Sequence, residues 1–118
     1  MSVITTVLAV LVAAEFLFIF YLETLATTSE RTAQTFNMTV DELSRPSVST
    51  LFKNQGVYNG VLAILLLVAA LCIPSKAAVI ALSTSMVAVA AYGAATSDPK
   101  IILKQGLLPA ILLVSGLI

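Results

Sequence analysis

The side chains of this sequence that are able to do chemistry are few, and the most informative is a carboxylate in an apolar segment. The chain has no His and one Cys, which excludes most zinc sites, every Cys–His or Ser–His pair and any internal disulfide. Glu15 lies in the middle of a long apolar run. A carboxylate at that depth is either protonated or paired. We interpret Glu15 first as a ligand or proton site and second as part of a structural ion pair or hydrogen-bonded network.

The other polar side chains of the apolar segments gather near one end of those segments. We count inward from the end that carries the long polar loop. Every charged, amide or phenolic side chain then falls between that end and the midplane, and the opposite half holds Leu, Val, Ile, Ala and a few hydroxyls. The members of this group, with one hydroxyl at similar depth, are Glu15, Tyr21, Gln55, Tyr58, Asn59, Ser85, Tyr92, Lys104 and Gln105. This pattern predicts a polar pocket, open toward the loop end and closed by an apolar plug.

Helical phase supports this pocket. Gln55, Tyr58 and Asn59 share one helix face by their i, i+3, i+4 spacing, and Ser85 shares another face with Tyr92. Pro109 cannot donate to the carbonyl four residues earlier, that of Gln105, so we expect a local break that exposes this carbonyl at pocket depth.

Several of these features also have simpler interpretations. Gly56 and Gly60 form a GxxxG pattern, whose commoner meaning is close helix packing, and a parallel homodimer through them stays open. Ser85 can bond its own helix carbonyls, and Tyr21 and Tyr92 can be interfacial belt residues.

The amino-acid composition indicates what kind of structure positions these side chains. Of 118 residues, 59% are apolar and 10% charged, whereas a soluble domain is about half apolar and a quarter charged. Six basic residues balance six acidic ones, which disfavours a cationic nucleic-acid binder. Disorder is excluded by the apolar content. We therefore predict an all-α, polytopic integral membrane protein of one domain, without metal or cofactor and without a nucleic-acid partner.

The hydropathy pattern predicts four transmembrane helices and one long polar loop. The loop covers residues 26–48, where Thr39 and Glu42 fit a capping box that Pro46 brings to an end. We expect this short helix to lie on the headgroups through Phe36, Met38 and Leu43. Asp98 and Pro99 predict the start of the last helix. The expected spans are about 2–25, 48–73, 77–95 and 99–118.

The basic residues predict an orientation for these spans. Five lysines or arginines lie on the side of the long loop and one, Lys76, on the other. The long loop should then be cytoplasmic and both termini outside.

A family resemblance supports the membrane assignment. Glu15 with Tyr21-Leu-Glu23, LFKNQGVYNG at 51–60, AYG at 91–93 and KQGLLPA at 104–110 together resemble a family of small bacterial membrane proteins, domain-of-unknown-function family 1304. The resemblance covers the whole chain and implies a four-helix protein of the bacterial cell membrane without an established activity. Some relatives carry an epimerase label, but no residue pattern in this sequence indicates that activity. The positions it implies as characteristic are Glu15, Glu23, Asn54, Gln55, Tyr58, Asn59 and Gln105.

Three functions compete on this sequence. The first is a pocket that binds, or acts on, a small amphipathic or lipid-like molecule; if it is an enzyme, Glu15 as base with Lys104 or Tyr58 as acid is the visible acid–base set. The second is a proton-coupled transporter acting as a homodimer. The third is a structural accessory subunit, for which pocket residues would tolerate substitution as freely as lipid-facing ones.

Overall fold

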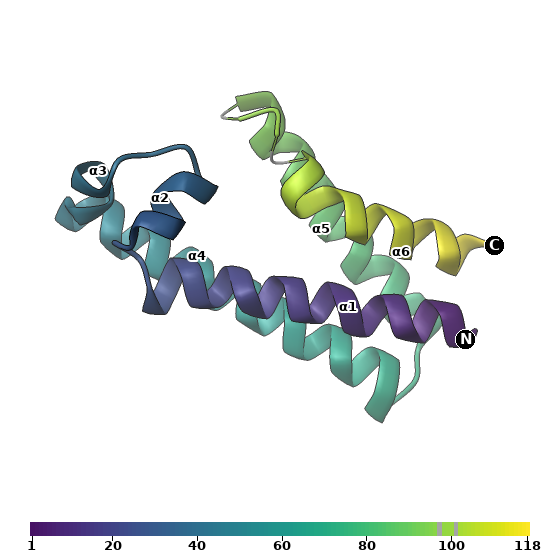
Figure 1. Ribbon diagram of the computed structural model, residues 1–118. Coiled ribbons are helices and arrows are strands. Elements are labelled where there is room, and N and C mark those ends of the chain that lie inside the picture. The colour runs from purple at the N-terminus through teal and green to yellow at the C-terminus, as the bar shows by residue number, and fades with distance from the viewer. Residues whose placement is uncertain (97, 101) are drawn as a thin grey trace. The chain divides into compact units, whose positions relative to one another are not determined.

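The computed structural model describes residues 1–96, 98–100 and 102–118, and every regular element within these ranges is a helix (Figure 1). The α-helices are α1 (Val3–Phe20), α2 (Glu30–Thr35), α3 (Val40–Ser44), α4 (Pro46–Leu67), α5 (Lys76–Thr96) and α6 (Leu107–Leu117). Wider, π-helical turns are η1 (Tyr21–Leu25), η2 (Val68–Cys72) and η3 (Ile102–Gly106). The all-α prediction is confirmed.

The chain divides into two compact units. Residues 1–15 and 62–118 form one, the terminal unit, and residues 16–61 form the other, the central unit. Helices α1 and α4 contribute residues to both units. By contrast, α2 and α3 belong wholly to the central unit, and α5 and α6 belong wholly to the terminal unit.

Among the residues that the structure describes, three helical segments are long and apolar enough to cross a membrane. They contain 23, 27 and 21 residues, or about 32–40 Å at 1.5 Å per residue, against a hydrocarbon thickness of about 30 Å. Their ends lie within two residues of the boundaries expected from the sequence. They are Val3–Leu25, Pro46–Cys72 and Lys76–Thr96.

The last apolar helix is shorter than the sequence suggests. It covers Leu103–Leu117, about 22 Å, so by length alone it falls short of a fourth crossing, and the count of four spans stays a prediction. The expected helix start at Asp98 and Pro99 is instead a turn, in which Asp98 Oδ1 accepts from the Lys100 N–H at 3.0 Å. Part of the expected span, Ile101, lies outside the described residues.

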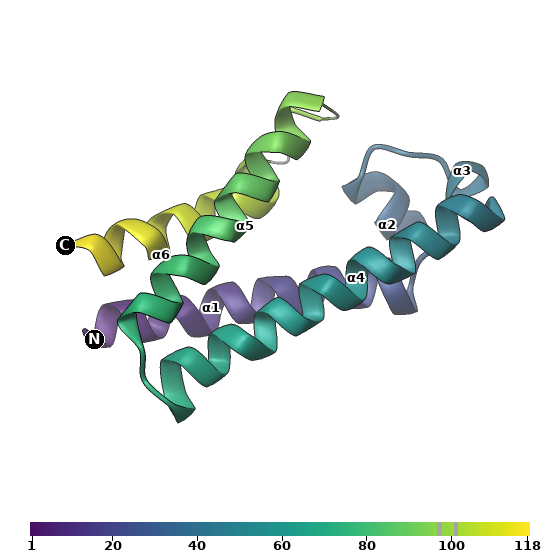
Figure 2. The ribbon, with the colours of Figure 1, turned by 180° about the vertical axis from the view of Figure 1, so that it is seen from behind.

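In the terminal unit, α5 and α6 pack along each other (Figure 2). Val79 and Met86 of α5 and Leu112 of α6 are buried. A Cβ at Gly116 would lie 3.3 Å from Ile80 Cγ1, which shows how closely α6 approaches α5. The hydroxyl of Thr5 donates to Ser115 Oγ at 3.1 Å and so joins the beginning of α1 to the end of α6.

In the central unit, the polar segment folds into two short helices. The predicted capping box is present, because Thr39 Oγ1 accepts from the Glu42 N–H and Glu42 Oε1 accepts from the Thr39 N–H. Helix α3 ends before Pro46, and Pro46 then opens α4. The sequence interpretation missed α2, which Ser29 caps by accepting from the Thr32 N–H.

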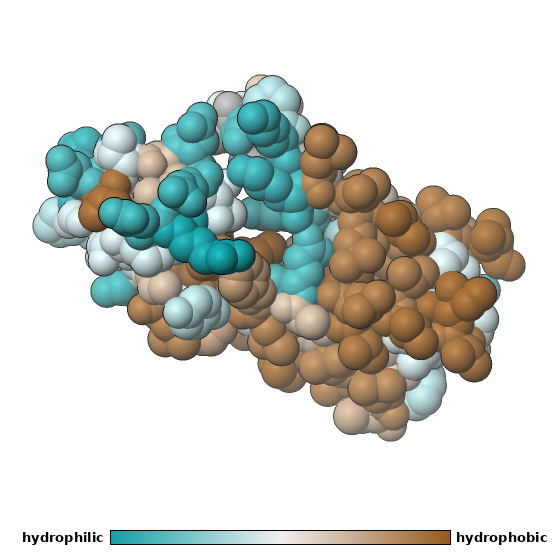
Figure 3. Space-filling model, viewed as in Figure 1, coloured by the Kyte–Doolittle hydropathy of each residue, from teal (hydrophilic) through white to brown (hydrophobic). Residues whose placement is uncertain are grey.

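The prediction that Leu43 faces lipid headgroups is wrong. Its side chain is fully buried within the protein, because α3 turns Leu43 inward and leaves Val40 exposed. Phe36 packs edge-on against Phe52 of α4, with ring centroids 5.3 Å apart, rather than standing free. Hydrophilic residues cover the outside of α2 and α3, whereas the beginning of α1 and helix α6 present apolar residues (Figure 3).

Candidate functional site

A buried carboxylate lies at the centre of the candidate site. Glu23 has no exposed surface, and both of its carboxylate oxygens accept hydrogen bonds from amide side chains of α4. The Gln55 amide donates to Oε2 at 2.8 Å, and the Asn59 amide donates to Oε1 at 2.6 Å. Gln55 and Asn59 are one helical turn apart, so the two amides clasp the carboxylate from one helix face.

Two glycines allow this contact. A Cβ at Gly56 would overlap Thr24 Oγ1 and lie 3.0 Å from the backbone nitrogen of Thr24, and one at Gly60 would lie 3.1 Å from a ring carbon of Phe20. Only glycine lets two backbones approach this closely. The GxxxG face is therefore used within the chain, as the commoner interpretation of the motif expects. The homodimer through these glycines stays a prediction.

The turn η1 aims the carboxylate. At the end of α1 the helix widens, and the Ala26 N–H bonds the carbonyl of Tyr21, five residues back, at 2.8 Å. Such turns carry one extra residue and occur frequently at functional sites. The first helix therefore changes phase just where Glu23 meets α4.

Threonine hydroxyls satisfy the backbone carbonyls around this turn. Thr27 Oγ1 donates to the Glu23 carbonyl at 2.7 Å. Thr32 Oγ1, from α2, lies 2.7 Å from the Ala26 carbonyl and 3.1 Å from that of Leu22. Thr24 Oγ1 donates across to the Lys53 carbonyl of α4 at 2.9 Å. Because buried carbonyls are costly without partners, these bonds make the turn a fixed part of the site.

The outer side of the cluster is polar and accessible. Gln55 and Asn54 are exposed, and the Tyr58 side chain is 74% exposed. Apart from the bond to Glu23, no further hydrogen bond of the Gln55 amide is found within the described ranges. The structure thus brings together three of the predicted residues, Glu23, Gln55 and Asn59, with Asn54 and Tyr58 on neighbouring positions of the same helix.

Of the other predicted residues, Tyr21 belongs to the central unit, and the terminal unit holds Glu15, Ser85, Tyr92, Lys104 and Gln105. Oε2 of Glu15 is buried and has no hydrogen-bond partner among the residues that the structure describes. Lys104 and Gln105 lie in η3, directly before α6. This wide turn precedes Pro109, close to the break that the sequence predicts. Ser85 donates to the Ala81 carbonyl of its own helix at 2.9 Å, and Tyr92 is 73% exposed.

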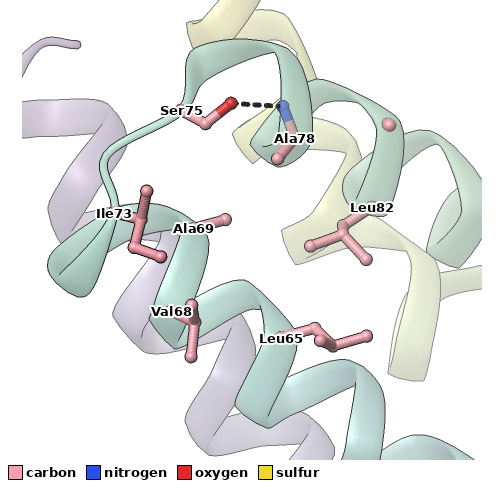
Figure 4. Close-up of a pocket in the computed structure, with 8 residues that line it drawn as sticks. Leu65, Val68, Ala69, Ile73, Ser75, Ala78 and Leu82 are labelled. Carbon is pink, nitrogen blue, oxygen red and sulfur yellow. Dashed lines mark hydrogen bonds between the residues drawn. The ribbon is translucent and has the colours of Figure 1, made fainter.

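The terminal unit also contains an apolar cleft. It has a volume of about 400 Å³ and lies between the end of α4 with η2 and the beginning of α5 (Figure 4). Its polar lining residue, Ser75, is occupied in accepting from the Ala78 N–H at 3.2 Å. The lining residues are Leu65, Val68, Ala69, Ile73, Ser75, Ala78, Ala81 and Leu82. This cleft suits hydrocarbon and offers no groups for chemistry.

Sequence reasoning on residues alone did not find Glu23 as a site residue; only the family resemblance pointed to it. Glu23 lies two residues from the expected end of the first span, outside the depth at which a carboxylate is conspicuous. A usable signal was present in the second span, where an amide precedes a glycine twice, in Gln55-Gly56 and Asn59-Gly60. This repeat places two amides beside the closest helix contact, where a carboxylate can meet both.

No group of three or more Cys, Asp or Glu side chains that could hold a metal ion occurs in the part of the chain that the structure describes. The chemical abilities of the central cluster are therefore those of a carboxylate held by neutral amides. It can accept and donate hydrogen bonds, and it can hold a proton or a polar ligand group.

Comparison with known proteins agrees with the resemblance seen in the sequence. The model of a family described as "Protein of unknown function (DUF1304)" matches residues 10–117. A relative described as uncharacterized protein YpaA, from Lactococcus lactis subsp. lactis (strain IL1403), is 46% identical over 117 residues, which cover 98% of this chain and 98% of that protein. No solved structure matches. The predicted membership is confirmed, and the chain belongs to the DUF1304 family.

Proposed function

We propose that this chain is a small integral membrane protein that binds the polar part of an amphipathic, lipid-like molecule beside Glu23. The observation that carries the proposal is the clasped carboxylate. Glu23 is fully buried and accepts from both amides, while Gln55, which supplies one of them, is itself exposed. A ligand placed against Gln55 would therefore bind an amide whose orientation is fixed by its hydrogen bond to the buried Glu23 carboxylate. Supporting hydrogen bonds of this kind hold a binding group in position.

The depth of this surface suits an amphipathic ligand. Pro46–Cys72 has 27 residues, about 10 Å more than the hydrocarbon thickness requires. If Cys72 lies at the far membrane surface, the hydrocarbon begins near Lys53. Gln55 and Tyr58 then lie just inside it, where headgroups give way to acyl chains. Exposed amides at this level favour an occupant that supplies hydrogen bonds.

The chemistry of the surface favours a neutral head with hydroxyl groups. Asn54 and Gln55 offer both donors and acceptors, and Tyr58 adds a phenol. In the orientation that the basic residues predict, the site opens toward the cytoplasmic leaflet.

Native mass spectrometry with a monoacylglycerol probe tests the proposal. The purified protein should retain the probe, and Asn54→Ala with Tyr58→Phe should weaken binding about tenfold or more, because two hydrogen bonds to the ligand head worth about 1 kcal/mol each are lost while the amides on Glu23 stay in place. Thr84→Val is the matched control, since this exposed hydroxyl bonds only the Ile80 carbonyl of its own helix. Equal retention by the double variant and the control, or no retention by the wild type, would overturn the proposal.

A second candidate is proton-coupled transport, which a different observation favours. Glu15 has a buried oxygen without a hydrogen-bond partner in the described ranges, and carboxyl groups of this kind occur in proton relays of membrane transporters. A pH-jump assay in liposomes would detect proton flux that Glu15→Gln abolishes. A structural accessory role, the third candidate, predicts that neither Glu15 nor Glu23 affects any binding or transport signal.

A further inference from the structure

The central unit also contains a cation over an aromatic ring. The guanidinium carbon of Arg31 lies 5.4 Å from the ring centroid of Phe18. Phe18 in turn stacks with Tyr21, with centroids 6.3 Å apart and ring planes at 21°. An arginine over an aromatic face gains cation–π attraction, and its planar fork of N–H groups is held in a defined orientation.

Helix α2 is fixed where it presents this arginine. The neighbouring Thr32 is fully buried, and its hydroxyl bonds the Leu22 and Ala26 carbonyls at the end of the first helix. Ser29 caps the other side of Arg31. Because both flanking contacts anchor the backbone, the exposed Arg31 is held where its guanidinium lies over Phe18 of the first span.

The charge of Arg31 has no ion-pair partner among the residues that the structure describes. Within the described part of the chain, no carboxylate lies in ion-pair distance of it. Glu30, its sequence neighbour, is exposed, and Glu23 is buried and engaged by the two amides. The N–H groups of the guanidinium also make no hydrogen bond among the described residues. They are therefore available to an anion.

The surroundings of this cation belong to a membrane. Phe18 and Tyr21 lie in the Val3–Leu25 segment, seven and four residues from its end, about 10 and 6 Å along the helix axis. Their rings are 44% and 50% exposed. Aromatic rings at this depth favour the boundary between headgroups and acyl chains. An anion that reaches Arg31 there is best supplied by a lipid whose chains lie along the same rings.

From this arrangement we infer a binding site for an anionic phospholipid at Arg31, Phe18 and Tyr21. The guanidinium donates two parallel N–H groups to the lipid phosphate, and the ring edges contact the upper acyl carbons. The site uses none of the side chains that bind the amphipathic ligand proposed above, so each proposal stands without the other.

Native mass spectrometry of the full-length protein tests this site, with phosphatidylglycerol and phosphatidylcholine as competing probes. The wild type should prefer phosphatidylglycerol. Arg31→Gln should reduce this preference about fivefold or more, the value of one basic side chain at an anionic surface. Arg31→Lys should lose part of the preference, since it keeps the charge but not the planar fork. Arg45→Gln is the matched control, because Arg45 is an exposed arginine of the same polar segment.

Each outcome of this experiment either supports or overturns the lipid site at Arg31. An equal loss in Arg45→Gln and Arg31→Gln would show only a general charge effect and overturn the site. Displacement of phosphatidylglycerol by millimolar inorganic phosphate would show that the anion comes from solution and would overturn the lipid assignment. No preference in the wild type would overturn the proposal. Selective loss in the two Arg31 variants, unaffected by inorganic phosphate, would establish it.

Discussion

At the scale of single residues, the main finding is that two carboxylates of one apolar helix have different surroundings. Glu23 has an amide on each oxygen, whereas one buried oxygen of Glu15 has no hydrogen-bond partner in the described ranges. A buried polar group without a partner costs more than a hydrogen bond contributes. Glu23 is therefore suited to a fixed role and Glu15 to an exchange of partners.

Two substitutions of Glu23 should separate the contribution of its charge to stability from the contribution of its shape. Glu23→Leu leaves the Gln55 and Asn59 amides without their acceptor, and we expect a loss of about 2–4 kcal/mol in the free energy of unfolding. Glu23→Gln keeps the shape and one acceptor oxygen, so its loss should be at most half as large. Thermal unfolding in a single detergent measures both. Equal losses in the two variants would contradict the clasp.

Glu15 and Lys104 form a second residue-scale prediction, made from the sequence. Both lie in the terminal unit, and an uncompensated charge in a span costs at least about 2.5–3.5 kcal/mol. We expect the two side chains to be coupled, so that the double variant Glu15→Leu with Lys104→Leu is more stable than the sum of the single losses predicts. Melting temperatures of all three variants decide this, and simple additivity would exclude the coupling.

At the scale of elements, close approach of the first and second apolar helices is the feature on which the site depends. Gly56→Ala would force a methyl group against Thr24 Oγ1 and the Thr24 backbone, and we expect a destabilisation of about 1–3 kcal/mol. Gly116→Ala is the matched control. There the methyl group would meet only the Ile80 side chain at 3.3 Å, and higher helix propensity offsets the crowding. If Gly56→Ala and Gly116→Ala had the same melting temperature, the stability of the protein would not depend on the close helix contact at Gly56.

The end of α2 offers a further test at this scale. Asn37 has a φ of 55°, and the Met38 N–H bonds the Ala33 carbonyl at 2.9 Å, so the helix closes with a left-handed residue as in a Schellman motif. Asn37→Gly should preserve stability or raise it slightly, whereas Asn37→Val should cost about 1–2 kcal/mol. Circular dichroism melts of the two variants compare these outcomes. A stable Asn37→Val protein would rule out this closure.

At the scale of the whole molecule, the open question is the number of crossings. Four crossings put both termini on one side, while three put them on opposite sides. We expect both termini outside, because the last helix can gain length from the residues that precede it and from local bilayer thinning. Labelling of Thr35→Cys from the cytoplasm and of Ser75→Cys from outside, with reporter fusions at each terminus, measures this. Cytoplasmic labelling of Ser75→Cys would reverse the orientation, and termini on opposite sides would remove the fourth span.

Sequence reasoning succeeded where local patterns decide the structure. The apolar runs gave the three long helices, and Thr39 with Glu42 gave the capping box. It failed where packing decides. The burial of Leu43 and the hydrogen bonds of Glu23 depend on which helix faces meet. The local sequence of one helix does not determine which face of another helix it meets. The later start of the last helix follows from the turn at Asp98, where the side chain bonds the backbone instead of capping a helix.

The wide turn η1 has a consequence for comparing this chain with its relatives. A turn with one extra residue is what a single-residue insertion into an ordinary helix produces. A relative that lacks the insertion would align to Val3–Leu25 only with a one-residue gap near Tyr21. In an alignment without that gap, Glu23 would be matched to a residue of the relative that faces a different side of the helix. Loss of the carboxylate inferred from an ungapped column would then be an error of alignment, and the acid would be found one position away.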